Sequence, residues 1–175
     1  MKTKQLIRKF FTIATISTLA WLNQDRVQAG ETAASHKGST APAWQLQDLM
    51  DGTISSTNFA GKVVVLDFWA TWCPPCREEI PGFIELQKKY AAQGLVVVGV
   101  SVDQASAKTI QSFVKKFGVN YPVVQSDAKT EAAYGNIESL PTTFIIDREG
   151  KIAKRHLGFT SKAEIEADII ALLKP

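Results

Sequence analysis

The chain contains two cysteines, Cys73 and Cys76, which are separated by Pro74 and Pro75. They follow an apolar run over residues 63–70 that is typical of a buried strand, and Pro74 suits the first position of a helix. Helix-start amides stabilise negative charge, so a sulfur placed there ionises more easily. The pattern predicts thiol–disulfide exchange, in which Cys73, the more exposed sulfur, attacks a disulfide and Cys76 resolves it.

Two other uses of the cysteine pair carry less weight. A bridge over two intervening residues closes a very short loop and removes little entropy from the unfolded chain, so a purely structural disulfide is disfavoured. A metal site needs more ligands than one Cys-x-x-Cys supplies. The two histidines, His36 and His156, lie far apart in sequence, in a predicted linker and a predicted strand. We therefore expect neither a metal nor another cofactor.

Residues 1–29 have the layout of a secretory signal peptide. The segment begins with four basic residues, continues with an apolar stretch over residues 10–22 and ends with Val27-Gln28-Ala29 before Gly30. The stretch is shorter than the ~18–20 residues of a spanning helix, so cleavage is favoured over an uncleaved membrane anchor. We expect an exported protein, located in the periplasm or another extracytoplasmic space.

The leader also accounts for the basic charge of the chain. The formal net charge is +3, but residues 1–29 hold five of the 20 Lys and Arg and one of the 17 Asp and Glu. The remainder carries a net charge of −1, which gives no indication of nucleic-acid binding. Residues 30–41 are small and polar and predict a flexible linker, and residues 42–175 are expected to form one domain.

The spacing of apolar residues in this domain predicts strands that alternate with helices. Strands are expected at residues 43–56 (a hairpin around Asp51-Gly52), 63–70, 95–102, 121–125, 142–147 and 151–156. Helices are expected at residues 74–93, 105–117, 128–134 and after Ser161, the last with Ile165, Ile169, Ile170 and Leu173 facing the core. This order indicates an α/β fold of three layers, α/β/α, with a central mixed sheet.

Two segments resemble the thioredoxin superfamily. Residues 65–76 are similar to the thioredoxin active-site strand and helix start, and residues 139–144 are similar to the segment around the thioredoxin cis-proline. Gly158 lies where that family has a glycine before its last helix. The N-terminal hairpin and the extra helix and strand between residues 102 and 128 resemble the exported TlpA/ResA-like thiol–disulfide oxidoreductases.

The resemblance implies a thioredoxin fold with an N-terminal β-hairpin and an inserted helix–strand. It implies an enzyme without a cofactor that reduces disulfides of client proteins, apocytochromes c among them. It further implies that a membrane thiol–disulfide electron donor re-reduces the enzyme. We expect a monomer, because no exposed apolar repeat indicates obligate assembly.

Further residues are expected to contact the client protein or to set the reactivity of Cys73. The resemblance implies that Pro141 is cis, which leaves the backbone of Leu140 free to pair with an extended client peptide. Trp72 is expected to form a partly exposed platform for clients. Pro74 and Pro75 have no amide hydrogen, so a Cys73 thiolate keeps mainly the amide of Cys76, which favours a reductant.

Two carboxylates are candidates for moving protons. Asp67 lies in an otherwise apolar strand, where burial raises its pKa. In thioredoxins the matching carboxylate assists deprotonation of the resolving cysteine. Glu79 lies one helical turn after Cys76 and matches an active-site glutamate of the ResA-like group, but a solvated helix glutamate is an equal alternative. The sequence leaves open which carboxylate handles the proton.

Three other functions remain open from the sequence. They are a disulfide oxidant or isomerase on the same fold, a peroxidase of the peroxiredoxin type, and a non-catalytic binding module. The oxidants often carry a histidine between their cysteines, and the peroxidases place the reactive cysteine in a Pro-x-x-x-Thr-x-x-Cys pattern. This sequence has neither feature, and its intact Cys-x-x-Cys argues against the binding module.

Overall fold

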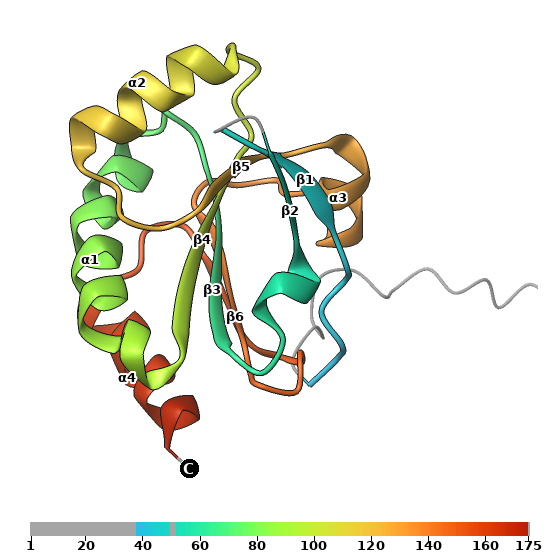
Figure 1. The fold of residues 1–175 in the computed structure, drawn as a ribbon, viewed down its shortest axis with the longest axis vertical. Helices are drawn as coiled ribbons and strands as arrows, with labels where there is room; N and C mark the ends of the chain where they lie inside the picture. Colours follow the sequence, from blue (N-terminus) through green and yellow to red (C-terminus); the bar gives the residue numbers. More distant parts are fainter. Residues whose placement is uncertain (1–37, 50–51, 175) are drawn as a thin grey trace, which may run out of the picture. The chain divides into compact units, whose positions relative to one another are not determined.

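A mixed sheet of seven strands organises the part of the chain that the computed structural model describes, residues 38–49 and 52–174 (Figure 1). The strands are β1 Gln45–Asp48, β2 Thr53–Ser55, β3 Val63–Trp69, β4 Leu95–Ser101, β5 Val123–Gln125, β6 Thr142–Ile146 and β7 Ile152–Leu157. Their order is β2-β1-β5-β4-β3-β6-β7. Strands β3, β4 and β5 are parallel, and the other pairings are antiparallel.

Helices cover both faces of this sheet. They are α1 Pro74–Tyr90, α2 Ala107–Phe117, α3 Ala128–Ala133 and α4 Lys162–Leu173, with short 3₁₀ helices at Ser56–Phe59 and Ala91–Gln93. Figure 1 shows α1, α2 and α4 on one side of the sheet and α3 on the other. The predicted three-layer fold is confirmed, including the N-terminal hairpin and the inserted α2 and β5.

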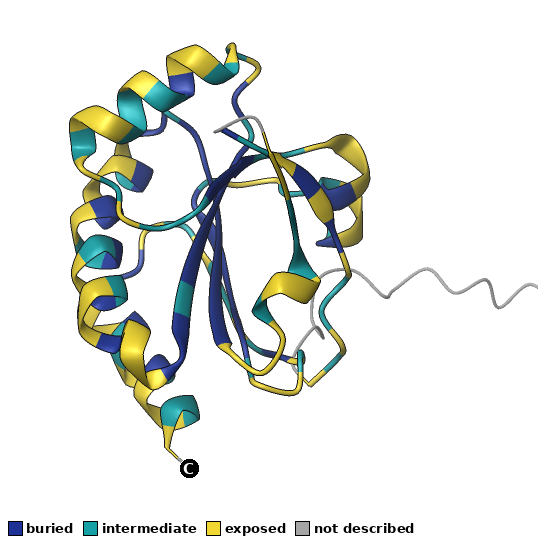
Figure 2. Ribbon diagram, viewed as in Figure 1, coloured by how far each residue is buried: buried dark blue, intermediate teal, exposed yellow. Residues whose placement is uncertain are grey.

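The central strand β3 is buried along its whole length (Figure 2). Val63 and Val65 pack with residues of α1 and α4, whereas Leu66 and Phe68 pack in the core on the opposite face. Burying a side chain of this size stabilises the fold by about 1.5–3 kcal/mol. An apolar run without alternation is thus what a parallel strand between two helical layers requires.

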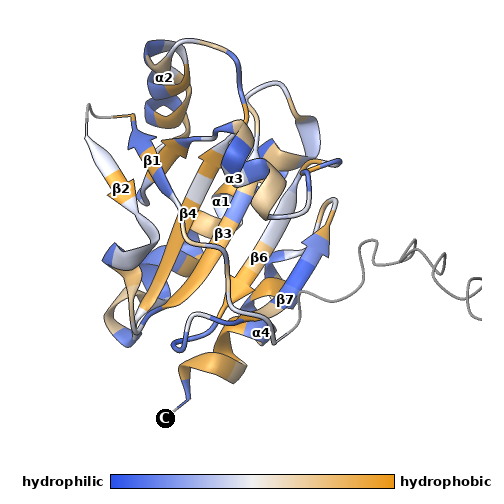
Figure 3. Cartoon of the chain, turned by 90° about the vertical axis from the view of Figure 1, so that its right-hand side faces the viewer, coloured by the Kyte–Doolittle hydropathy of each residue, from blue (hydrophilic) through white to orange (hydrophobic). Residues whose placement is uncertain are grey.

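The sheet becomes polar toward its β7 edge. Figure 3 shows apolar colour along β3 and β4 and hydrophilic colour along much of β7. The β7 residues Lys154, Arg155 and His156 are charged or polar, which protects an edge strand from pairing with other chains. No helix of the described residues combines the length and apolar character needed to cross a bilayer.

The last residues of the predicted linker, from Gly38 on, are hydrogen-bonded to the edge of the sheet. Gly38 donates from its amide to Ile152 O at 2.7 Å, and Ile152 donates to Ser39 O at 2.8 Å. Thr40 forms a β-bridge with Lys151. The last residues of the predicted linker over 30–41 therefore pair with the sheet edge. The predicted signal peptide, the linker up to residue 37 and Asp51 of the predicted turn lie outside the described residues.

One residue of the last helix differs from the prediction. Ile165 and Ile169 are buried, but Ile170 is 38% exposed. Because each helical residue turns by about 100°, a core face built on Ile165 and Ile169 continues to Leu172 and leaves Ile170 to one side. Leu172 and Leu173 pack partly against the same core. The expectation that Ile170 faces the core is wrong.

This difference gives a matched pair of substitutions. We expect Ile169→Ala to lower the free energy of unfolding by about 2–5 kcal/mol, because it opens a cavity in a fully buried site. Ile170→Ala on the same helix should cost less than about 1 kcal/mol. Guanidinium denaturation of both variants measures the difference, and equal losses would place Ile170 in the core after all.

Candidate active site

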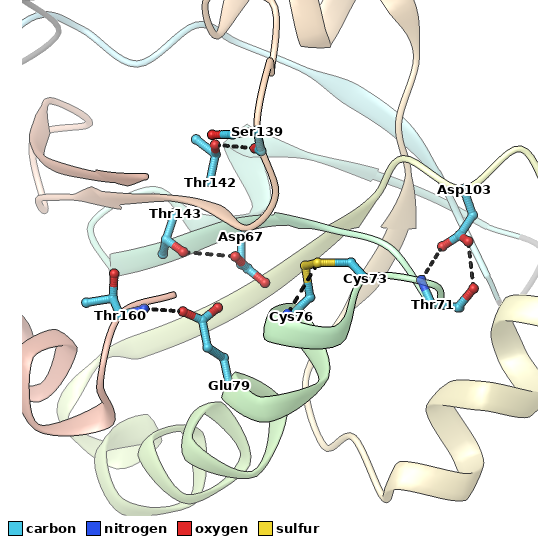
Figure 4. The surroundings of a disulfide bond; sticks show 10 residues. All are labelled: Asp67, Thr71, Cys73, Cys76, Glu79, Asp103, Ser139, Thr142, Thr143 and Thr160. Carbon is cyan, nitrogen blue, oxygen red and sulfur yellow. Dashed lines mark hydrogen bonds between the residues drawn. A yellow bond between two sulfur atoms is a disulfide. The ribbon is translucent and has the colours of Figure 1, made fainter. Parts of the chain in front are cut away.

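The two cysteines lie at the junction of β3 and α1 (Figure 4). Cys73 is the N-cap of α1 and is bonded to Cys76 in a disulfide. Cys73 is 3% exposed and Cys76 is 1% exposed, so the difference has the predicted direction but both residues are buried in this oxidised state.

The helix start offers Cys73 few hydrogen-bond donors. The amide of Cys76 donates to Cys73 Sγ at 3.3 Å. Pro74 and Pro75 occupy the first helical positions and have no amide hydrogen to donate. The predicted donor, the Cys76 amide, is therefore present at the Cys73 sulfur of the disulfide, and its role as the main donor to a thiolate stays a prediction.

Asp67 is buried on β3 on the cysteine side of the sheet. Figure 4 shows its carboxyl group directed toward the disulfide. Its cross-strand partner Thr143 donates from Oγ1 to Asp67 Oδ1 at 2.9 Å. Burial raises the pKa of Asp67 to about 7, and the hydrogen bond from Thr143 opposes this increase. The predicted direction of the shift is confirmed.

Glu79 is also buried, at 5% exposure, so the alternative of a solvated helix glutamate is wrong. The amide of Thr160 donates to Glu79 Oε1 at 2.6 Å. Glu79 Oε2 has no hydrogen-bond partner among the described residues. Burial and then the negative charge of Asp67 raise the pKa of Glu79 to about 8, while the Thr160 amide lowers it. Sequence position alone could not reveal this burial, because Thr160 lies in a distant segment.

The two carboxylates form an electrostatically coupled pair. Ionisation of Asp67 makes ionisation of Glu79 harder, so the pair titrates in two steps around neutral pH. Burial and the charges of both carboxylates also raise the pKa of Tyr121 above its usual range. Tyr121 therefore stays protonated, and the pair can accept or release one proton near pH 7.

The cis-proline loop closes the other side of the site. The Leu140–Pro141 bond is cis, as predicted. Gly158 donates its amide to Pro141 O at 2.8 Å, and Thr142 Oγ1 donates to Ser139 O at 2.7 Å. These two bonds fix the loop against β7 and β6.

A cavity of about 470 Å³ lies beside the disulfide, and we call it the disulfide groove. Its lining residues are Trp72, Cys73, Pro74, Pro75, Val102, Glu131, Ile137, Glu138, Ser139 and Leu140. Trp72 is 66% exposed, as expected of a platform, whereas Trp69 is 3% exposed and packs in the core. The groove thus brings the predicted residues Trp72, Pro74, Pro75 and Leu140 together around Cys73.

Asp103 is a part of the site that the sequence did not predict. Its Oδ2 accepts the Thr71 amide at 2.9 Å, and its Oδ1 accepts the Thr71 hydroxyl at 2.7 Å (Figure 4). Oδ2 also accepts the Ser101 hydroxyl at 2.8 Å. These bonds fix the loop that leads to Cys73. A signal was present, because residues after the ends of two parallel neighbouring strands, β3 and β4, lie close together.

No group of three or more His, Cys, Asp or Glu among residues 38–49 and 52–174 is placed to hold a metal ion. His156 lies on β7 and pairs instead with Asp168 of α4, at 3.0 Å. The predicted linker residue His36 lies outside the described residues.

Comparison with known proteins agrees with this geometry. Residues 37–155 match the AhpC/TSA family. The chain is 35% identical over 175 residues to the thiol-disulfide oxidoreductase ResA of Bacillus subtilis, which covers 99% of this chain and 96% of the relative. The similarity therefore extends over nearly all of this sequence and of the relative.

Two solved structures from Chlorobium tepidum are similar in fold. One is assigned as the thiol:disulfide interchange protein DsbE and is 36% identical, with a TM-score of 0.73 over 79% of this chain and 98% of that chain. The other is a thiol:disulfide interchange protein of the thioredoxin family and is 31% identical, with a TM-score of 0.72 over 81% of this chain and 100% of that chain. The fold is therefore the thioredoxin fold.

The contribution to stability of the hydrogen bond from the Thr71 hydroxyl to Asp103 can be tested by replacing Thr71. We expect Thr71→Val to lower the free energy of unfolding by about 1.5–3 kcal/mol, because it removes a hydrogen bond to a buried carboxylate. Thr71→Ser keeps the hydroxyl and should lose much less. Guanidinium denaturation of the oxidised proteins compares the two variants. A Ser variant as unstable as the Val variant would show that the hydroxyl bond to Asp103 does not stabilise the fold.

The buried pair predicts that stability depends on pH. The pKa of Asp67 is near 4 in the unfolded chain and about 7 in the fold, so the folded state retains a proton that the unfolded state loses. Stability should therefore be greatest below pH 4 and fall through pH 7, by up to about 4 kcal/mol from Asp67.

The control is Asp67→Asn, which should reduce this pH dependence and be more stable than the natural protein at pH 8. Glu79, whose pKa is also raised, should account for the dependence that remains. Denaturation of the oxidised proteins from pH 4 to pH 9 provides the comparison. A natural protein equally stable across that range would contradict the assignment.

Proposed function

The chain belongs to the AhpC/TSA family and is a thiol–disulfide oxidoreductase with a thioredoxin fold, and from this premise we propose that it acts as an exported dithiol reductant of client proteins. The observation that carries the proposal is the poor supply of donors at the Cys73 sulfur. A thiolate stabilised mainly by one amide makes the reduced state less stable and therefore a stronger reductant.

The proposed reaction transfers two electrons to the client. The Cys73 thiolate attacks one sulfur of the client disulfide, which forms a mixed disulfide and releases the other client sulfur as a thiolate. The Cys76 thiol gives its proton to the carboxylate pair and attacks Cys73 Sγ. The mixed disulfide breaks, the Cys73–Cys76 bond forms, and the second client sulfur also leaves as a thiolate. The client has then gained two electrons, and its two thiolates take up protons from the solvent, into which the carboxylate pair releases the proton of Cys76.

The positions of Asp67 and Glu79 indicate which of the two carboxylates accepts the proton of Cys76. Cys76 is almost fully buried, so its proton needs an acceptor inside the protein. Asp67 is directed toward the disulfide and titrates near neutral pH, which suits it to accept that proton (Figure 4). The pKa of Glu79 is raised further, to about 8, so Glu79 stays mostly protonated near pH 7, and we assign it the supporting role.

The partners follow from the same reaction. Export, supported by the leader over residues 1–29, places the enzyme where a soluble thiol pool is absent, so a membrane dithiol donor must re-reduce Cys73–Cys76. Apocytochromes c are the client class that the TlpA/ResA-like resemblance implies, since their haem-attachment cysteines must be reduced. We do not propose a peroxidase, because neither cysteine stands in a Pro-x-x-x-Thr-x-x-Cys pattern, and the intact Cys73–Cys76 pair argues against a binding module.

The reduction potential of the Cys73–Cys76 pair tests the proposed direction. We expect a value near about −270 mV, measured by equilibration with dithiothreitol buffers, because few donors stabilise the Cys73 thiolate. Pro75→His restores an amide and adds an imidazole, and it should raise the potential by about 30 mV or more, which corresponds to about 1.4 kcal/mol. A natural value near about −120 mV would instead identify a disulfide oxidant.

A further inference from the structure

The disulfide groove has features beyond those that disulfide exchange requires. It extends from Cys73 and the start of α1 to the loop before the cis-proline, and to Glu131 on α3. Several of its walls are apolar, namely Trp72, Val102, Ile137 and Leu140. A groove of about 470 Å³ next to the reactive sulfur can hold several client side chains as well as the client cysteine.

The charges that line the groove have one sign. Glu131 and Glu138 are its charged lining residues, and no lysine or arginine of the described chain is among them. Neither glutamate forms an ion pair with another described residue. Glu131 is partly buried and Glu138 is exposed, so both carboxylates can act on a bound segment. The groove therefore attracts positive charge.

Trp72 adds a second feature that favours a cation. Its indole is 66% exposed and lines the same groove as the two glutamates. A cation above an indole ring is attracted by the electrons of the ring face. The planar guanidinium of arginine stacks on an indole and binds carboxylates better than the ammonium of lysine does. Exposed indole and unpaired carboxylates together match an arginine side chain.

We propose that the disulfide groove binds clients through a cationic side chain next to the client disulfide, with arginine preferred over lysine. The cation contacts Trp72 and is attracted by Glu131 and Glu138, while the client cysteine meets Cys73. This inference rests on the proposed reduction of client disulfides and specifies which clients react fastest.

The test uses reduced protein and a set of disulfide-looped peptides that differ in one residue beside the attacked cysteine, namely Arg, Lys, Gln or Glu. Oxidation of the protein gives a second-order rate constant for each peptide. A neighbouring cation also speeds exchange chemically, so each constant is divided by that of the same peptide with dithiothreitol. We expect the Arg peptide to exceed the Glu peptide by about tenfold after this correction, with Lys and Gln between them.

Variants of the groove residues test whether the preference for the Arg peptide arises in the disulfide groove. Glu131→Gln with Glu138→Gln should reduce the Arg-to-Glu ratio to about two- or threefold, whereas Trp72→Leu should abolish the preference of Arg over Lys. Glu149→Gln with Glu164→Gln removes the same charge from residues outside the groove and should leave the ratio unchanged. High salt should also reduce the ratio.

The outcomes separate this inference from the proposed function. Equal corrected rates for all four peptides, or a ratio unchanged in the Glu131 and Glu138 variant, would overturn the charge preference and leave client reduction standing. Failure to reduce even the Gln peptide would overturn both.

Discussion

The pairing of β3 with β4 and β6 is the constraint on which the active site depends. The parallel register of Asp67 with Gly99 and of Trp69 with Ser101 ends both strands at the same edge. There the loop before Cys73 meets Asp103, and α1 begins. The antiparallel register with β6 places Thr143 opposite Asp67 and brings the cis-proline loop to the disulfide. A shift of one residue would turn Asp67 to the opposite face of the sheet.

The burial of Asp67 and Glu79 lowers the stability of the fold at pH values where these carboxylates are charged. Asp67 and Glu79 lie in a core that disfavours their charged forms, and one hydrogen bond to each carboxylate only partly offsets the cost. The same burial brings both titrations close to neutral pH, where a carboxylate can exchange a proton with a thiol. The proposed proton transfer thus accounts for two buried carboxylates in a strand and a helix that otherwise pack apolar side chains.

Most helices and strands could be predicted from the sequence, because the spacing of apolar residues and the helix caps depend only on residues close together in the chain. This local pattern identified β3, α1 and the cap at Ser161, and the family resemblance supplied the cis bond before Pro141. It misjudged Ile170, because the sequence of an apolar helix does not show which of its sides meets the sheet. It also missed Asp103, whose partners Thr71 and Ser101 become neighbours only when β3 and β4 pair.

The sequence by itself determined the chemistry. Two cysteines separated by two prolines at a helix start define a redox pair and limit its donors, because these effects need only adjacent residues. Tertiary structure decided the surroundings of that pair. Glu79 is buried and accepts the amide of Thr160, which lies in the loop before α4. The charged groove forms because α3 and the cis-proline loop lie beside Cys73. Burial and electrostatic coupling depend on distances between remote segments, which only the folded chain fixes.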